Sequence, residues 1–459
     1  MLNHLPHDAQ TPAWQQMFQW IVNPFALMES SAQRYGDLFT LPIGDKLAPV
    51  VLLHSPQLLQ EVLADSKDYE APGDRNGLFE PILGQQSVLS LSGAAHRRQR
   101  QLLLPPFHGE RMRMYGQMIW DITGQVIERL PVGQPFSVRS FMQSIAMQVI
   151  LQTVFGLEQG ERVQRLERLV AAMLDSISSP LGVAMLYIPS FRWDLGRFSP
   201  WGRFLHQRQQ IDQLIYREIH DRRQAPNPDR TDILSLLMSA CDEVGQPLTD
   251  VELRDELMTL LVAGHETTAT ALTWALYWLH ALPEVKAKAL RELDSLGDQI
   301  TPATVARLPY LAAISAETLR IYPVGMLAFP RVPKTAQRLM GYEIEAGTVL
   351  LGCIYLLHQR EDLYPEPKRF KPERFLLRQF SPYEYMPFGV GARRCIGMAF
   401  AQYEMQIVLA RMLSEVELKL INDRPMKPVR RGLTSGAGDV RLTVVGRRSL
   451  PARTLEPLT

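Results

Sequence analysis

The residues best suited to chemistry lie in the segment 388–397, which reads Phe-Gly-Val-Gly-Ala-Arg-Arg-Cys-Ile-Gly. Its cysteine, Cys395, stands immediately before a helical pattern that runs from Met398 to about Leu413. A sulfur at a helix N-terminus meets backbone N–H groups and the positive end of the helix dipole, which favour the thiolate over the thiol. Gly391 and Gly397 allow a tight turn and a close approach to a flat cofactor. The segment therefore predicts a sulfur ligand for a bound metal.

Cys395 is one of three widely spaced cysteines, together with Cys241 and Cys353. An odd, sparse set forms no disulfide framework and favours a reducing compartment, and its spacing excludes a Cys-x-x-Cys zinc or iron–sulfur site. A lone cysteine is usually a small core residue. Here five residue types surround it at fixed offsets, a match expected by chance on the order of 1 in 10,000 times. That rarity favours a ligand over a core residue.

The segment resembles the cysteine-ligand loop of the cytochrome P450 family, and further matches follow in family order from about residue 30 to the C-terminus. The resemblance implies that Cys395 is the axial ligand to the iron of haem b, iron protoporphyrin IX, with Phe388, Gly391, Arg393 and Gly397 beside the cofactor. It also implies a mainly α fold with small β-sheets, in a single large domain over residues 1–459. The haem would lie between a long central helix and the helix after the cysteine, and residues 1–30 would form an N-terminal extension without a transmembrane anchor.

Two more segments match elements of that family. Glu317-Thr-Leu-Arg320 is a Glu-x-x-Arg element, and residues three apart on a helix share a face and can pair. Alone it is a weak signal, because most such pairs are solvated surface bridges. Downstream, residues 372–375 read Pro-Glu-Arg-Phe, as in the family. The resemblance implies that Arg374 completes a buried network with Glu317 and Arg320, which holds the cysteine loop and does not react.

A long helix is predicted to begin at a capping box, Thr249-Asp-Val-Glu252, and to end before Pro283. At about 1.5 Å per residue it would run about 50 Å, enough to cross the whole domain. Its centre, residues 263–268, reads Ala-Gly-His-Glu-Thr-Thr and resembles the family's oxygen-activation motif. An alternative is a buried polar kink held by local back-bonding of the threonines.

The resemblance implies that Thr267 hydrogen-bonds bound oxygen or a water and that Glu266 relays protons to it. The small residues Ala263 and Gly264 would leave room for oxygen and substrate against the helix. We expect His265, despite its position, to be a packing residue.

A haem also carries two propionates, which need cationic or donor partners. His96 and Arg100 lie one turn apart on a predicted helix and resemble the family's propionate-binding segment, and Arg331 and Arg393 match further such positions. The alternative for each is a solvated surface cation. Three further arginines match no ligand position, namely Arg97, Arg98 and Arg394. They predict a positive patch on the proximal face that attracts an acidic electron donor such as a ferredoxin.

The substrate pocket is expected, by resemblance, to draw on five regions that are mostly aliphatic. The candidate lining residues are Leu78, Phe79, Leu83, Met185, Leu260, Leu261, Val324, Met326, Leu327, Phe329 and Leu433. Their character favours a lipophilic substrate such as a fatty acid, an alkane or a terpenoid. The alternative is that these side chains belong to the core.

Hydrophobic patterns predict the elements that must position these residues. Two β-rich runs, Asp37–Ile43 and Val50–His54, flank a Gly-Asp-Lys turn and predict a hairpin. From about Pro56 the pattern is helical, with irregular stretches at 70–93, 178–200 and 359–387. Strand-like runs return after residue 331 and at 440–445. These patterns fit a helical body with small β elements.

Composition excludes several classes of protein. The chain has 459 residues, 46% of them hydrophobic, and a net charge of +1, which argues against a nucleic-acid partner. Met1–Pro12 lacks the pattern of a signal peptide. The apolar run Leu257–Leu282 carries polar and charged residues at its centre, which are costly in lipid, so we expect no membrane span.

The combined interpretation is a monooxygenase that binds dioxygen and hydroxylates its substrate. Electrons would come from NAD(P)H through a separate reductase with a ferredoxin or flavodoxin, because no nucleotide-binding segment is fused. We expect a cytoplasmic monomer, resembling bacterial or cyanobacterial members, with weak peripheral membrane contact through Trp193–Trp201 left open. A peroxygenase or rearranging enzyme is an alternative, but such members tend to lose the acid–alcohol pair. A non-catalytic haem sensor or carrier is another.

Overall fold

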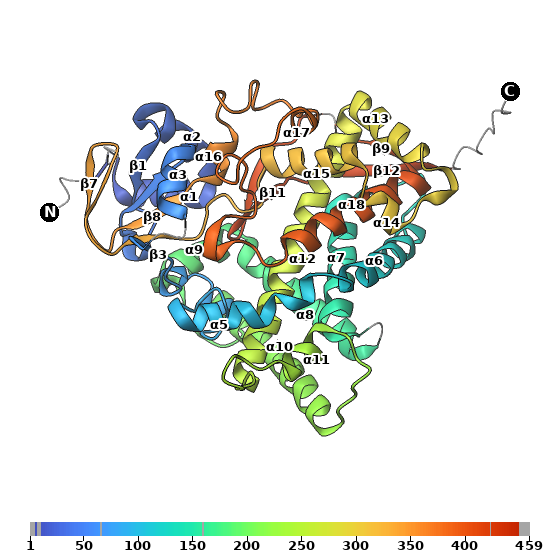
Figure 1. Ribbon diagram of the computed structural model, residues 1–459, viewed down its shortest axis with the longest axis horizontal. Helices are drawn as coiled ribbons and strands as arrows, with labels where there is room; N and C mark the ends of the chain where they lie inside the picture. The colour runs from blue at the N-terminus through green and yellow to red at the C-terminus, as the bar shows by residue number, and fades with distance from the viewer. Residues whose placement is uncertain (1–4, 7–10, 65–66, 158–159, 423, 449–459) are drawn as a thin grey trace.

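The computed structural model describes residues 5–6, 11–64, 67–157, 160–422 and 424–448. It is a helical body with a small β-rich lobe, which lies on the left of Figure 1. The helices are α1 (Ala13–Val22), α2 (Pro24–Tyr35), α3 (Pro56–Leu63), α4 (Glu80–Leu83), α5 (Gly93–Leu103), α6 (Arg111–Glu128), α7 (Val138–Phe155), α8 (Glu161–Ser178), α9 (Pro180–Tyr187), α10 (Pro200–Gln224), α11 (Ile233–Ser239), α12 (Asp250–Ala281), α13 (Pro283–Asp294), α14 (Pro302–Val305), α15 (Pro309–Ile321), α16 (Ile354–His358), α17 (Arg374–Leu377) and α18 (Met398–Glu415). The strands are β1 (Leu38–Leu41), β2 (Val50–Leu53), β3 (Tyr69–Glu70), β4 (Pro135–Ser137), β5 (Val332–Pro333), β6 (Gln337–Leu339), β7 (Tyr342–Ile344), β8 (Val349–Gly352), β9 (Val416–Leu420), β10 (Pro428–Arg431), β11 (Thr434–Ala437) and β12 (Arg441–Arg447).

Helix α12 crosses the centre of the molecule (Figure 1). The capping box is formed, since the Thr249 hydroxyl accepts the Glu252 N–H and the Glu252 carboxylate accepts the Thr249 N–H at 2.8 Å. The helix spans 32 residues and stops at Ala281, just before Pro283 begins α13. Most of its side chains are buried on all sides, as expected for a core helix. Its predicted start and end are confirmed.

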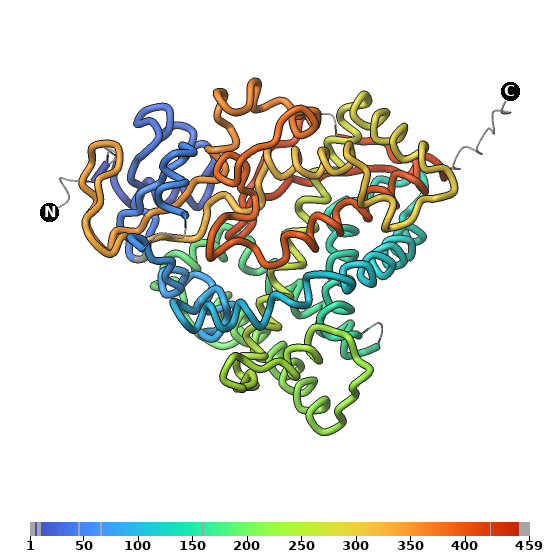
Figure 2. Tube along the Cα trace, viewed as in Figure 1, coloured from blue at the N-terminus to red at the C-terminus, as the bar shows by residue number. Residues whose placement is uncertain are grey.

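The predicted hairpin is also confirmed. Strands β1 and β2 pair antiparallel, with Leu38 opposite Leu53 and Leu41 opposite Val50. Strand β8 adds to β2 in parallel, with Val50 opposite Val349, so segments far apart in the sequence meet in one sheet. Figure 2 shows these blue and orange segments side by side. Every residue of β1 and β2 is buried, because helices cover the sheet.

The segment expected to be an N-terminal extension is part of the core where it is described. Residues 1–4 and 7–10 lie outside the described residues, but α1 and α2 pack against the β-rich lobe through Trp20, Phe25 and Met28. The outer face of α1 carries Trp14 and Phe18, both more than 60% exposed.

The stretch 178–200, expected to be irregular, contains the helix α9, which begins at Pro180 with Ser179 as its N-cap. Beyond it, Trp193 and Phe198 are exposed, whereas Trp201 is buried, stacks on Phe204 and lies under the Arg192 guanidinium. Trp201 is therefore a packing residue, and the membrane contact considered for Trp193–Trp201 could not include it.

Across the described ranges, no single helix has the length and apolar composition needed to cross a bilayer. Helices α8 and α9 meet those criteria only as a pair, and they are bent by 80° where they join.

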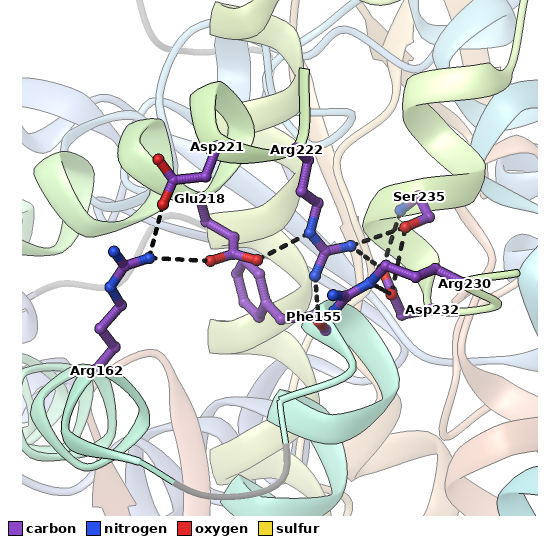
Figure 3. A network of polar contacts seen from close by, with 8 residues as sticks. All are labelled: Phe155, Arg162, Glu218, Asp221, Arg222, Arg230, Asp232 and Ser235. Atoms are coloured by element: carbon purple, nitrogen blue, oxygen red, sulfur yellow. Dashed lines mark hydrogen bonds and ion pairs between the residues drawn. The ribbon is translucent and has the colours of Figure 1, made fainter. Parts of the chain in front are cut away.

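A buried polar network joins the C-terminal end of α7 to α10 and α11 (Figure 3). The Arg222 guanidinium donates to Asp232, to the Ser235 hydroxyl at 2.8 Å and to the Phe155 carbonyl. Arg230 donates to the same carboxylate and the same carbonyl. Phe155 ends α7, so two arginines satisfy a carbonyl that the helix leaves without an internal partner. The side chains of Arg222 and Asp232 are only 8% and 4% exposed.

We predict that Arg222→Met lowers the free energy of unfolding by about 3 kcal/mol, because it leaves a buried carboxylate short of its main partner. Urea denaturation of the holoprotein would measure the change. Arg162→Met is the matched control, since Arg162 belongs to the outer end of the same network and is 56% exposed. Equal midpoints for the Arg222 variant and the parent would contradict this role.

Candidate functional site

The cysteine loop is a tight turn leading into α18. Gly389 and Gly391 both have φ of +65°, a conformation that favours glycine. The Cys395 N–H donates to the Phe388 carbonyl at 2.9 Å, which closes the loop. Gly397 is the N-cap of α18, and its N–H faces the sulfur. The loop geometry therefore matches the turn expected from its glycines.

The Cys395 thiol is accessible to solvent although protein surrounds it on nearly all sides, so it borders an internal space. Burial raises its pKa, and this outweighs the Gly397 N–H and the charges of Arg100 and Arg394, which lower it. The helix terminus alone thus does not produce the thiolate that the sequence suggested. A bound metal cation would, because a coordinating thiol is deprotonated.

A buried ion pair on α15 lies behind this loop. Arg320 donates from Nε and Nη2 to the two oxygens of Glu317, at 2.6 and 2.9 Å, and both side chains are fully buried. The Lys371 N–H donates to Glu317 at 2.8 Å, and the Arg374 Nε lies 3.4 Å from the same oxygen. The three residues that the sequence grouped are therefore in contact.

Arg320 also binds the end of α16 and the irregular stretch 359–387 that follows it. Its Nη1 donates to the His358 carbonyl and its Nη2 to the Pro367 carbonyl, both at 2.8 Å. The His358 ring in turn accepts the Met386 N–H at 3.1 Å, two residues before the cysteine loop begins. Burial and the charge of Arg320 lower the pKa of His358 to about 3, so the ring stays neutral and can accept that bond.

The centre of α12 borders an internal space. Ala263 is exposed and Thr267 is partly exposed, although the helix around them is buried. The Thr267 hydroxyl donates to the Ala263 carbonyl one turn earlier. These two residues, four apart, lie on one face of the helix.

Glu266 and Gly264 face α7. The Glu266 carboxylate accepts from Arg139 at 2.8 Å and from Gln143 at 2.9 Å. A Cβ on Gly264 would lie 2.7 Å from the Ile150 side chain. Gly264 thus permits close packing of α12 and α7, a role that the sequence did not suggest. His265 is buried, as expected of a packing residue.

Three arginines and a histidine, which together we call the cation cluster, gather near the cysteine loop: His96 and Arg100 on α5, Arg331 and Arg393. The Arg393 guanidinium donates to the carbonyls of Val88 and Ala71 at 2.8 and 2.7 Å, and its Nε is buried without a partner. Burial and the charges of Arg331 and Arg100 lower the pKa of Arg393 to about 10. Burial and the charges of Arg393, Arg100, Arg331 and Arg97 lower the pKa of His96 to about 4.

The cation cluster fits an anionic cofactor. Buried like charges repel one another, and an anion among them would relieve that repulsion and could accept from the Arg393 Nε. Together with a sulfur ligand on an internal space, this arrangement fits a planar metal cofactor that carries carboxylates.

The three arginines expected to form a positive patch separate into two kinds. Arg97 and Arg394 are exposed. Arg98 instead pairs with Asp242 and donates to Glu252 at 2.8 Å, so its charge is neutralised within the protein. Arg98 does not belong in that patch.

The candidate pocket residues also separate by burial. Those that are partly exposed and can border a space are Leu78, Phe79, Leu260, Leu327, Phe329 and Leu433. The rings of Phe79 and Phe329 are 5.9 Å apart. Those buried within the packed core are Leu83, Met185, Leu261, Val324 and Met326. For this second group, the interpretation as core residues describes the structure better.

Sequence reasoning missed two sets of residues. One is Arg139 and Gln143, which hold Glu266 from α7. The other is Asp255 and Glu256 of α12, which bind the backbone of the segment 84–92. Both acids lie in the charged first turns of the predicted helix, just before its apolar run begins at Leu257, where acids near a helix N-terminus are ordinarily solvated, so the sequence carried no signal for the second set.

Comparisons with known proteins agree with this site. The family model described as Cytochrome P450 matches residues 6–442. The chain is 37% identical over 399 residues to the Mycobacterium tuberculosis protein designated cytochrome P450 135B1, covering 86% of this chain and 82% of that one. It is 33% identical over 445 residues to cytochrome P450 138 of the same organism, covering 97% of each.

Two solved structures share the fold, as the resemblance implied. Retinoic-acid-bound cyanobacterial CYP120A1 superposes with a TM-score of 0.81 at 22% identity, over 94% of this chain and 96% of that one. The cytochrome P450DA haem domain gives a TM-score of 0.81 at 24% identity, over 97% of each chain. With a family model that spans nearly the whole chain, a match in fold and a sulfur on an internal space, the chain belongs to the cytochrome P450 family and is a haem monooxygenase.

Proposed function

We propose that this monooxygenase holds haem b through Cys395 and hydroxylates a lipophilic substrate with electrons from a separate redox partner. The observation that carries the proposal is the Cys395 sulfur, accessible at an internal space at the start of α18. Haem bound through a thiolate activates dioxygen and inserts one oxygen atom into a C–H bond. Gly391, Gly397 and Phe388 shape the loop around the sulfur, and Glu317, Arg320 and Arg374 hold it in place.

The cation cluster is proposed to bind the two haem propionates. Arg100, Arg331 and Arg393 supply charge, and a neutral His96 supplies a ring N–H. The low pKa of His96 supports its neutral form at pH 7. Arg393 is two residues from Cys395, so one loop would hold both the iron and a propionate.

Thr267 and Glu266 are proposed to move protons toward bound oxygen. Thr267 lies on the accessible face of α12, beside Ala263, where its hydroxyl can turn from the Ala263 carbonyl toward a ligand. Glu266 must release Arg139 to reach that side. Arg139 lies 3.7 Å from Asp175, whose side chain is 64% exposed, so these contacts connect Glu266 to solvent.

The proposed substrate class rests on the partly exposed pocket residues, and the proposed electron donor rests on the exposed arginines. The partly exposed pocket residues are apolar, which supports a fatty acid, an alkane or a terpenoid. The retinoic acid bound by the similar cyanobacterial protein is one such molecule. Arg97 and Arg394, exposed near the cysteine loop, support docking of an acidic ferredoxin or flavodoxin, supplied by an NAD(P)H-dependent reductase. We propose that the protein acts as a cytoplasmic monomer.

We predict that the dithionite-reduced protein under carbon monoxide gives a strongly red-shifted Soret band, and that Cys395→Ala abolishes it by removing the thiolate ligand. A difference spectrum measures both. Cys241→Ala, which changes an exposed cysteine on another segment, is expected to retain the band. If the Cys395→Ala variant gave the same red-shifted Soret band as the parent, Cys395 would not be the ligand.

We predict that Thr267→Ala lowers the product formed per reductant consumed by about tenfold, because protons no longer reach bound oxygen in order. Product and hydrogen peroxide, measured against NAD(P)H consumed, give the ratio. Thr267→Ser keeps the hydroxyl and should retain most of the coupling. Full coupling in the alanine variant would remove the role proposed for Thr267.

Fatty acids, alkanes and terpenoids are expected to shift the haem absorption spectrum on binding. We predict that Leu260→Asn weakens binding of the best ligand by about tenfold, since it replaces apolar pocket surface with an amide. Leu377→Asn is the control, because Leu377 is 87% exposed on α17. Spectral titration measures both, and an unchanged dissociation constant in the Leu260 variant would exclude that residue from the pocket.

A further inference from the structure

Glu256 is a buried carboxyl group on α12 that faces the segment 84–92. It is fully buried, and its Oε1 accepts the Val88 N–H at 2.7 Å. Its Oε2 has no hydrogen-bond partner. Burial raises the pKa of Glu256 well above its usual range, which favours the neutral acid. The hydrogen bond that Glu256 makes within the described residues is to backbone and not to a cation.

The backbone of Val88 is also held through its carbonyl group. The Val88 carbonyl accepts from Nη1 of Arg393 at 2.8 Å. Val88 is thus a bridge with Glu256 of α12 on its N–H and Arg393 of the cysteine loop on its carbonyl. Displacing Val88 would move an acceptor that orients the Arg393 guanidinium.

Glu256 also lies beside α5, which carries His96 and Arg100 of the cation cluster. The Gln99 amide is close enough to lower the pKa of Glu256, although Gln99 Nε2 and Glu256 Oε2 do not meet hydrogen-bond geometry. Gln99 precedes Arg100 and follows His96 by three residues on α5. Glu256 therefore contacts Val88 by a hydrogen bond and has Gln99 of α5 as a neighbour.

Other contacts between α12 and this segment bypass Arg393. Asp255 accepts the Gln86 N–H at 2.8 Å, and the hydroxyls of Ser87 and Thr259 are 2.7 Å apart. These contacts hold the same segment on the same helix but leave the backbone of Val88 free of them. Removing one of these contacts therefore shows what loosening the segment 84–92 does when the Val88 backbone contacts stay intact.

We propose that Glu256 is a positioning residue for the cation cluster, which fixes the Val88 backbone and through it the guanidinium of Arg393. This inference rests on the proposed binding of haem propionates by Arg393. Its consequence is that haem retention depends on a residue of α12 outside the cofactor site.

Haem release from the holoprotein to excess apomyoglobin tests the proposal. Glu256→Leu removes the acceptor of the Val88 N–H and is expected to accelerate release about tenfold, the equivalent of one buried hydrogen bond. Glu256→Gln keeps an oxygen acceptor and a neutral group, so its release rate should stay within about twofold of the parent. Thr259→Val removes the Ser87 contact and is expected to lower the urea midpoint without accelerating release.

A double-mutant cycle with Arg393→Gln separates the positioning role of Glu256 from the propionate binding proposed for Arg393. If Glu256 acts through Arg393, Glu256→Leu adds little once Arg393 is replaced. Additive effects, or equal acceleration by Thr259→Val, would overturn the positioning role. If Arg393→Gln alone leaves release unchanged, the proposed function of Arg393 fails instead. Should Glu256→Leu not retain haem, Glu256→Asp, shorter by one methylene, gives the same cycle at smaller amplitude.

Discussion

The fold around the cysteine loop depends on satisfying one buried guanidinium. Arg320 is fully buried, and its N–H groups require acceptors there, because an unsatisfied buried charge costs several kcal/mol. Glu317 supplies two oxygens from the same helix, and the remaining acceptors are the His358 and Pro367 carbonyls. A stretch with little regular secondary structure is thereby fixed to α15. The Met386 N–H on the His358 ring extends that order to the start of the loop that carries Cys395.

Helix α12 connects the two sides of the site through one face. Glu256, Thr259, Ala263 and Thr267 follow one another at spacings of three and four residues, so they form a stripe along the helix. The first two hold the segment 84–92, and the last two border the internal space. Glu266 lies on another face and pairs with α7. The same helix can therefore order the segment 84–92 with one part of the stripe, border the internal space with the other and pair Glu266 with α7, because the helical period places Glu266 on a different face.

Local patterns predicted the features that local interactions determine. The capping box at Thr249, the hairpin of β1 and β2 and the Glu317–Arg320 pair depend on residues close in sequence, and all are present. Other features depend on distant partners. Arg139 and Glu266 are 127 positions apart, and Arg98 is neutralised by Asp242, 144 positions away. No local spacing pattern in the sequence reveals either pairing. The close packing at Gly264 was missed for the same reason, since Ile150 comes from α7. Helix α9 was missed because Pro180 and Gly182 resemble loop residues, although proline suits a first helical turn.

The ionisation of Glu256 bears on how the cation cluster can bind carboxylates at all. An ionised Glu256 would place a negative charge on the other side of Val88 from the Arg393 guanidinium. Burial disfavours that ionised form. A neutral acid can still accept the Val88 N–H, so it orders the backbone without neutralising the arginines. If the cluster binds the cofactor as proposed, the arginines keep their positive charge for its carboxylates, and cofactor binding is linked to stability because it relieves repulsion among them.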